Sequence, residues 1–165
     1  FFISLNGYSR MSKIEKFFGK GQLSNNILTF YNYLVSINYN NCSLTYKAKE
    51  FLEYLNQNNF EPIILSGGNK SEIHNYLKVN LNQIKFKDIL GDRKTKHAWI
   101  NHLLTQVSDP KQILFIGDSM VDHKAANDTY VDFILMTKYS QDFDFKITKK
   151  SLKTIDTLEM LLNKW

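Results

Sequence analysis

Two carboxylates stand four positions apart after an apolar run, in the segment Gly117-Asp118-Ser119-Met120-Val121-Asp122. The apolar run, residues 113–116, predicts a buried strand, and the residues after it predict the start of a helix. Asp118 at the strand tip and Asp122 in the helix can converge, and two such carboxylates repel unless a cation or a proton lies between them. Hard oxygen ligands of this kind suit Mg²⁺. The simpler alternative is that Asp118 caps the helix.

A second apolar run, residues 62–65, ends in Ser66-Gly67-Gly68. A hydroxyl followed by two residues without side chains leaves backbone N–H groups open to an anion, and a helix that begins near Asn69 adds its positive end. The same residues are equally typical of a tight strand-to-helix turn, so both interpretations stay open. The order Gly-Lys-Ser/Thr is missing, which excludes a P-loop.

A basic cluster, Arg93-Lys94-Thr95-Lys96, lies between these two strand ends in the sequence. Such a run is usually surface charge. Its position indicates that one of the two lysines faces the site, where a point charge suits a phosphate or a cluster of carboxylates.

Strands alternate with helices from Leu44 onward. The pattern predicts strands at 62–65, 86–90, 113–116 and 131–136, and helices near 48–55, 70–77, 99–107, 121–127 and 155–162. This alternation indicates βαβ units and a parallel, doubly wound sheet of the α/β class. In such a sheet ligands bind beyond the carboxyl ends of the strands, where both candidate motifs lie.

The first 42 residues have helical spacing twice, with a break at Gly19-Lys20-Gly21. A polar linker is expected over 39–43, so we predict a helical segment at 1–42 and an α/β core at 43–165. The aromatic residues of the chain, Tyr31, Tyr33 and Tyr46 among them, have helix-compatible spacing and are expected in the core. The chain begins Phe1-Phe2-Ile3 without an initiator Met, and we expect that the natural N-terminus has been removed.

Composition excludes several classes of protein. The 165 residues carry a net charge of +5 from 21 Lys+Arg and 16 Asp+Glu, and the basic residues are scattered, which argues against a nucleic-acid partner. No apolar run approaches the roughly 20 residues of a membrane span. Cys42 is the single cysteine, which predicts a buried thiol in a reducing, cytoplasmic setting. The sequence does not predict an oligomeric state.

The strand ending in Ser66-Gly67, the lysine before a helix, and the run from Gly117 to Ala126 together resemble the haloacid dehalogenase (HAD) superfamily. The resemblance extends from Leu44 to about Met136 and implies a Rossmann-like core with Mg²⁺-dependent phosphohydrolase activity. The front segment, with Gly7-Tyr8-Ser9-Arg10, resembles the small helical cap of phosphoglycolate-phosphatase-like members.

The resemblance also implies a role for each candidate. Ser66, with the amides of Gly67 and Gly68, would bind the phosphate, and Asp118 and Asp122 would hold Mg²⁺. The motif lysine, which acts in catalysis with Asp118, is assigned to Lys96, with Lys94 as the alternative. Arg10 is the expected cap contact to the substrate.

The chain departs from the family pattern in one respect. Family members begin with a strand ending Asp-x-Asp, whose first Asp attacks phosphorus and whose second is the general acid and base. No such element precedes the helical segment, and its loss would leave a hole in the centre of the sheet and an unpaired edge. The Asp142-Phe143-Asp144 segment follows Tyr139-Ser140-Gln141 in place of an apolar strand, so we interpret it as a loop.

Two functions are therefore expected. The first is a Mg²⁺-dependent HAD-like phosphomonoester hydrolase that acts on a small phosphorylated metabolite, such as phosphoglycolate or a sugar phosphate, and is inactive as this fragment. The alternative is a pseudo-phosphatase that serves as a binding or regulatory module.

Overall fold

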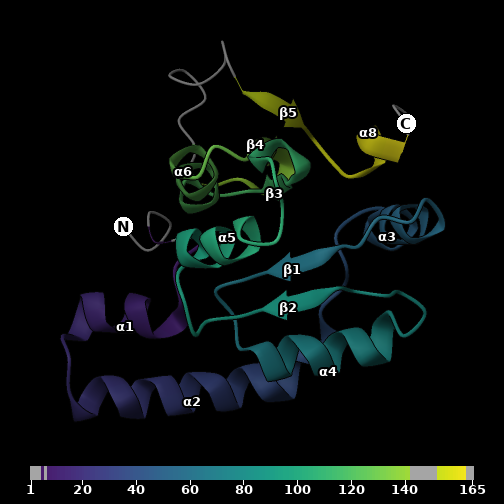
Figure 1. Ribbon diagram of the computed structural model, residues 1–165. Coiled ribbons are helices and arrows are strands. Elements are labelled where there is room, and N and C mark those ends of the chain that lie inside the picture. The colour runs from purple at the N-terminus through teal and green to yellow at the C-terminus, as the bar shows by residue number, and fades with distance from the viewer. Residues whose placement is uncertain (1–4, 6, 142–151, 163–165) are drawn as a thin grey trace.

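Two helices open the chain and an alternating α/β unit follows them (Figure 1). The computed structural model describes residues 5, 7–141 and 152–162. The front part contains α1 (Arg10–Phe18), α2 (Gln22–Asn38) and the 3₁₀ helix η2 (Tyr39–Asn41). The rest contains α3 (Ala48–Gln57), β1 (Ile63–Leu65), α4 (Lys70–Asn80), β2 (Asp88–Leu90), α5 (Lys96–Leu104), η3 (Pro110–Gln112), β3 (Leu114–Gly117), α6 (Met120–Asp128), β4 (Asp132–Met136), η4 (Thr137–Tyr139), β5 (Lys153–Ile155) and α8 (Glu159–Leu162). The predicted α/β class is confirmed.

All strand pairs are parallel. β1 pairs with β2, with Ile64 opposite Ile89, and β3, β4 and β5 form a second sheet in that order. Within the part of the chain that the structure describes, the strands thus form two separate sheets, and no ladder joins β1 to β3.

The three-stranded sheet is covered by helices on both faces. Phe115 and Phe133 are opposite each other in register, and both pack against the cluster that α5 and α6 supply. The next register pair, Ile116 and Ile134, belongs to the cluster on the other face, which includes Phe51 of α3. Because side chains alternate along a strand, adjacent apolar residues serve opposite faces, which explains the continuous apolar run in the sequence.

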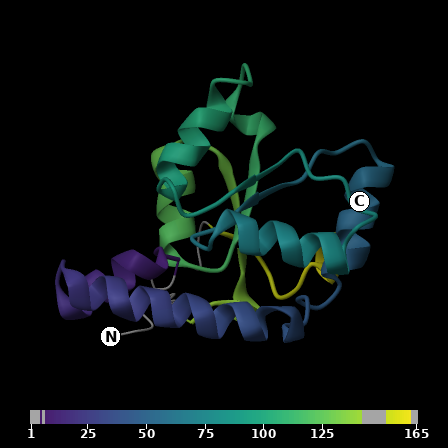
Figure 2. The same ribbon diagram turned by 90° about the horizontal axis from the view of Figure 1, so that it is seen from below.

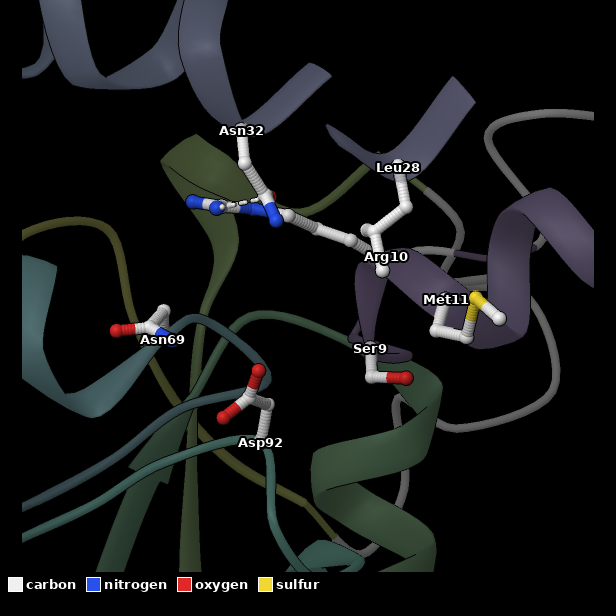
Figure 3. Close-up of a pocket in the computed structure, with 7 residues that line it drawn as sticks. All are labelled: Ser9, Arg10, Met11, Leu28, Asn32, Asn69 and Asp92. Atoms are coloured by element: carbon white, nitrogen blue, oxygen red, sulfur yellow. Dashed lines mark hydrogen bonds between the residues drawn. The ribbon is translucent and has the colours of Figure 1, made fainter. Parts of the chain in front are cut away.

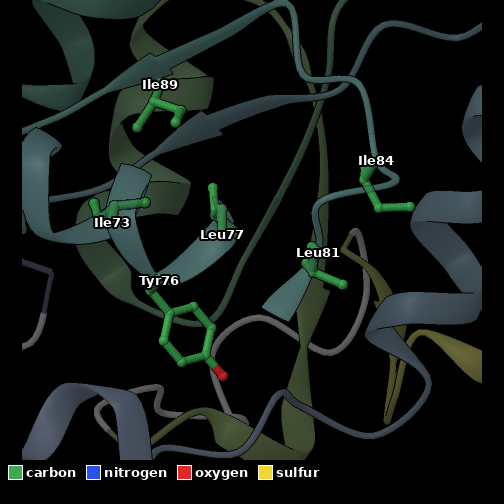
Figure 4. Close-up of a cluster of buried hydrophobic side chains, with 6 residues drawn as sticks. All are labelled: Ile73, Tyr76, Leu77, Leu81, Ile84 and Ile89. Atoms are coloured by element: carbon green, nitrogen blue, oxygen red, sulfur yellow. The ribbon is translucent and has the colours of Figure 1, made fainter. Parts of the chain in front are cut away.

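A separate core joins α4 to the two-stranded sheet. Ile73, Tyr76 and Leu77 of α4 are buried with Ile89 of β2, and Leu81 and Ile84 close the end of the cluster (Figure 4). Asn69 begins α4 because its Oδ1 accepts hydrogen bonds from the N–H groups of Ser71 and Glu72. The helix thus starts directly after the Ser66-Gly67-Gly68 turn.

The two front helices run side by side, and the end of α2 reaches α4 (Figures 1 and 2). The Tyr76 hydroxyl donates a 2.6 Å hydrogen bond to the Cys42 carbonyl, and the Tyr39 and Tyr76 rings meet edge to face. Between the helices Gly19 adopts a φ of +72°, a conformation that favours glycine.

Several expectations were wrong. Tyr31, Tyr33 and Tyr46 are exposed because α2 contacts the rest of the molecule on one side only and Tyr46 lies in a surface turn, and Cys42 is exposed rather than buried. The linker predicted over 39–43 begins with the 3₁₀ turn η2. The predicted closing helix of 155–162 shrinks to α8, because residues 153–155 form the edge strand β5 along β4. Asp142 and Asp144 lie outside the described residues.

The helix predicted over 99–107 is displaced towards the N-terminus. α5 begins at Lys96, because the Thr95 hydroxyl accepts a hydrogen bond from the Ala98 N–H, and it ends at Leu104. Among the described residues, no helix has the length and apolarity to span a membrane.

The core beneath the second sheet provides a stability test. Ile100 is 1% exposed in the α5–α6 cluster, so Ile100→Ala should lower the free energy of unfolding by roughly 2–5 kcal/mol. Val79→Ala, at a position 69% exposed on α4, is the matched control and should change it by less than about 0.5 kcal/mol. Urea unfolding followed by circular dichroism measures both, and equal effects would contradict this description of the core.

Candidate active site

The carboxylate of Asp122 is the best-bonded group at the carboxyl end of β3. Its Oδ2 accepts hydrogen bonds from the Asp118 N–H at 3.2 Å, the Ser119 N–H at 3.1 Å and the Ser119 hydroxyl at 2.7 Å. Ser119 is the N-cap of α6, and Asp122 completes its capping box. The helix is therefore capped by Ser119 and not by Asp118, which removes the simpler interpretation of Asp118.

Lys96 completes the set of donors around Asp122. Its ammonium forms an ion pair with Oδ1 across 26 residues of sequence, and the side chains of Lys96 and Asp122 are only 12% and 3% exposed. Lys94 is directed elsewhere, with its ammonium 4.7 Å from the centre of the Trp99 ring. Of the two lysines that the sequence leaves open, Lys96 is thus the one that reaches the Asp122 carboxylate.

Gly117 leaves room for this arrangement. A Cβ atom there would lie 2.5 Å from the Cβ and 2.7 Å from the Cγ of Asp122, closer than side-chain atoms can pack. The glycine therefore lets the Asp122 side chain fold back over the end of β3.

The Ser66 turn lies at the carboxyl end of β1. The Gly68 N–H donates a 3.0 Å hydrogen bond to the Ser66 Oγ, which fixes the serine rotamer and leaves its hydroxyl proton available for donation. Gly91 supports the turn from β2, since a Cβ there would lie 2.8 Å from the Lys70 nitrogen and 2.9 Å from the Gly68 oxygen. The Gly68 amide is thus already engaged, so the phosphate-binding prediction rests more on Ser66 and Gly67.

The front segment connects the two strand ends. A Cβ at Gly67 would lie 3.0 Å from the Tyr8 carbonyl, and one at Gly7 would lie 2.5 Å from the Ser119 hydroxyl. Gly7 has a φ of +84°, which favours glycine. Residues 7 and 8 therefore contact both candidate motifs, and the site lies where these three segments meet.

Lys13 is a residue of this region that the sequence analysis missed. It lies half-buried on α1, and burial lowers its pKa, with the charge of Lys96 lowering it further. A second cation therefore faces the region of Lys96 from the front helices. Helical spacing alone could not have identified it, because its neighbour lies more than 80 residues away in sequence.

Arg10, the expected cap contact to the substrate, is hydrogen-bonded to protein side chains. Its guanidinium donates two hydrogen bonds to the Glu72 carboxylate, at 3.0 and 2.6 Å, and one to Asn32 Oδ1 at 2.9 Å. These bonds join α1 and α2 to the first turn of α4.

Asp118 and Asp122 supply some of the oxygen ligands that a hard cation such as Mg²⁺ needs. Asp122 already accepts hydrogen bonds from Lys96 and Ser119, which makes Asp118 at the strand tip the better candidate for direct contact with a metal. Mg²⁺ is commonly held by one or two carboxylates together with waters and phosphate oxygens. Across the described ranges, no cluster of three or more metal-ligating His, Cys, Asp or Glu side chains exists.

Comparisons with known proteins identify the family. The family model for haloacid dehalogenase-like hydrolases matches residues 2–136, so the chain belongs to this family. No curated protein matches the chain.

Solved structures share the fold at low sequence identity. A predicted haloacid dehalogenase-like hydrolase from Bacteroides fragilis has a TM-score of 0.81 and 19% identity over 97% of this chain and 80% of its own. A predicted phosphoglycolate phosphatase from Haemophilus somnus has a TM-score of 0.74 and 19% identity over 99% and 80%. A β-phosphoglucomutase from Clostridium difficile has a TM-score of 0.69 and 20% identity over 96% and 75%.

The buried ion pair gives a second stability test. Asp122→Asn leaves Lys96 without its countercharge in a nearly buried position and should lower the free energy of unfolding by roughly 3–5 kcal/mol. Asp132→Asn breaks the Lys111–Asp132 pair, whose side chains are 61% and 42% exposed, and should cost less than about 1 kcal/mol. Urea denaturation of the two variants makes the comparison, and similar losses would show that the Lys96–Asp122 pair is not a structural anchor.

Proposed function

We propose that this chain carries the phosphate- and metal-binding site of a HAD-family phosphomonoester hydrolase that acts on a small phosphorylated metabolite. The observation that carries the proposal is the Lys96–Asp122 ion pair, because it brings a lysine to the acidic strand end beside Asp118. Membership of the hydrolase family supports it. The fold shared with a predicted phosphoglycolate phosphatase and a β-phosphoglucomutase is consistent with a phosphate ester as substrate.

Each residue has a separate task in this proposal. The Ser66 hydroxyl and the Gly67 N–H donate hydrogen bonds to phosphate oxygens, helped by the positive end of α4. Lys96 offsets the negative charge of the phosphate, and Asp122 holds the lysine in place. Mg²⁺, bound by Asp118 and through water by Asp122, would act as a Lewis acid on the phosphate.

The proposed mechanism also needs a carboxylate nucleophile. In the family pattern it lies on a strand next to the Ser66 and Asp118 strands, and in this molecule that position would be between β1 and β3. None of the described strands occupies it. The second candidate is a module that binds phosphate without hydrolysing it.

Phosphate release distinguishes the two candidates. We expect Mg²⁺-dependent release from p-nitrophenyl phosphate if a nucleophile reaches the site, and Asp118→Asn should reduce the rate roughly a hundredfold or more. Asp128→Asn, on the exposed end of α6, is the matched control and should retain the rate.

Two other outcomes are informative. Saturable binding of inorganic phosphate without any release would assign the chain to the binding module. Release that persists unchanged in Asp118→Asn, or the absence of both release and binding, would contradict the proposed site.

A further inference from the structure

A small polar pocket lies beside the candidate active site, between the front helices and the core (Figure 3). Its volume is about 90 Å³, and its polar lining comes from Ser9, Arg10, Asn32, Asn69 and Asp92. Three of the lining residues are next in sequence to segments of the candidate site. Ser9 follows Gly7-Tyr8, Asn69 follows the Ser66 turn, and Asp92 follows Gly91, with the Asp92 N–H donating to the Gly68 carbonyl at 3.0 Å. The pocket is therefore placed to receive the organic part of an ester whose phosphate lies at Ser66.

The one cation in the lining is neutralised by its neighbour. Arg10 and Glu72 form a two-bond ion pair in which the side chains are only 18% and 20% exposed, and these hydrogen bonds raise the pKa of Arg10. Asn32 and the ring of Tyr31, 5.4 Å from the guanidinium carbon, hold the arginine on its other sides. In Figure 3 the guanidinium extends towards Asn32 and away from Ser9. A ligand carboxylate would have to displace Glu72 before it could pair with Arg10.

Asp92 adds a negative charge to the lining, and among the described residues it forms no ion pair. In Figure 3 its carboxylate lies between Asn69 and Ser9. A carboxylate or second phosphate on the ligand would be repelled there, because like charges at short range oppose each other. A hydroxyl group, in contrast, can donate to Asp92 or to the Asn32 oxygen and can accept from an amide nitrogen.

We propose that this pocket selects phosphate esters whose organic part carries hydroxyl groups and disfavours esters that carry a carboxylate, with Glu72 and Asp92 as the specificity-determining residues. The inference rests on the proposed function, since it assumes that the phosphate binds at the adjacent site. It narrows the substrate class to neutral polyol or sugar phosphates and away from phosphoglycolate.

A matched pair of ligands tests this selection. 2-Hydroxyethyl phosphate and 2-phosphoglycolate each have two carbons and one phosphate, and they differ only at the second carbon, which is a hydroxymethyl group in the first and a carboxylate in the second. We expect the chain, with Mg²⁺ present, to prefer 2-hydroxyethyl phosphate by about tenfold or more. The preference is measured as the ratio of kcat/KM, or as the ratio of Kd by calorimetry if no phosphate is released.

Two variants locate the cause of the preference. Glu72→Gln removes the countercharge of Arg10, and Asp92→Asn removes the repelling carboxylate from an exposed position. Each variant should therefore reduce the preference for 2-hydroxyethyl phosphate over 2-phosphoglycolate at least about threefold. Glu50→Gln breaks the surface pair with Lys47 outside the pocket and should leave the ratio unchanged.

The possible results distinguish a failure of this inference from a failure of the proposed function. Equal use of the two ligands, a preference for 2-phosphoglycolate, or a ratio that neither variant alters would overturn the inference while the phosphate site stands. Failure of both ligands and of inorganic phosphate to bind would overturn the proposed function and the inference together.

Discussion

One buried carboxylate organises the carboxyl end of β3. Asp122 receives the ammonium of Lys96, two backbone N–H groups and the Ser119 hydroxyl, and it folds so closely over Gly117 that no other residue fits there. A buried carboxylate stabilises the arrangement of the groups that donate to it. Removing one of these donors leaves part of the carboxylate's desolvation cost uncompensated. Asp122 thereby links the first turn of α6 to Lys96 at the start of α5 and to the Asp118 backbone at the strand tip.

The rest of the candidate site is assembled from the other sheet and from the front helices. Ser66 and its glycines end β1, and residues 7 and 8 contact both that turn and Ser119. The Arg10–Glu72 pair and the Tyr76–Cys42 hydrogen bond fasten the front helices to α4, so the same contacts that hold the helices also shape the pocket over the site. In the proposed function, phosphate binding and substrate choice belong to different parts of the chain.

Local sequence signals predicted the helices and most strands well, because they depend on spacing, caps and apolar runs. The three-residue strand β5 was missed, since Lys153-Thr154-Ile155 forms a strand only by pairing with β4. That a lysine meets the Asp122 carboxylate was predictable from strand-end positions, but the choice of Lys96 over Lys94 depended on the start of α5. The expected contact of Arg10 with the substrate stays a prediction, and the sequence could not have shown that Glu72, 62 residues away, binds its guanidinium.

The central claim is that phosphate binds where β1 and β3 end. The most direct test is a titration of the ¹⁵N-labelled chain with inorganic phosphate and Mg²⁺, followed by the chemical shifts of its backbone amides. This account predicts saturable shifts concentrated at residues 66–68 and 117–119 and at Lys96. Shifts confined to scattered surface lysines, or no saturable shifts at all, would contradict it.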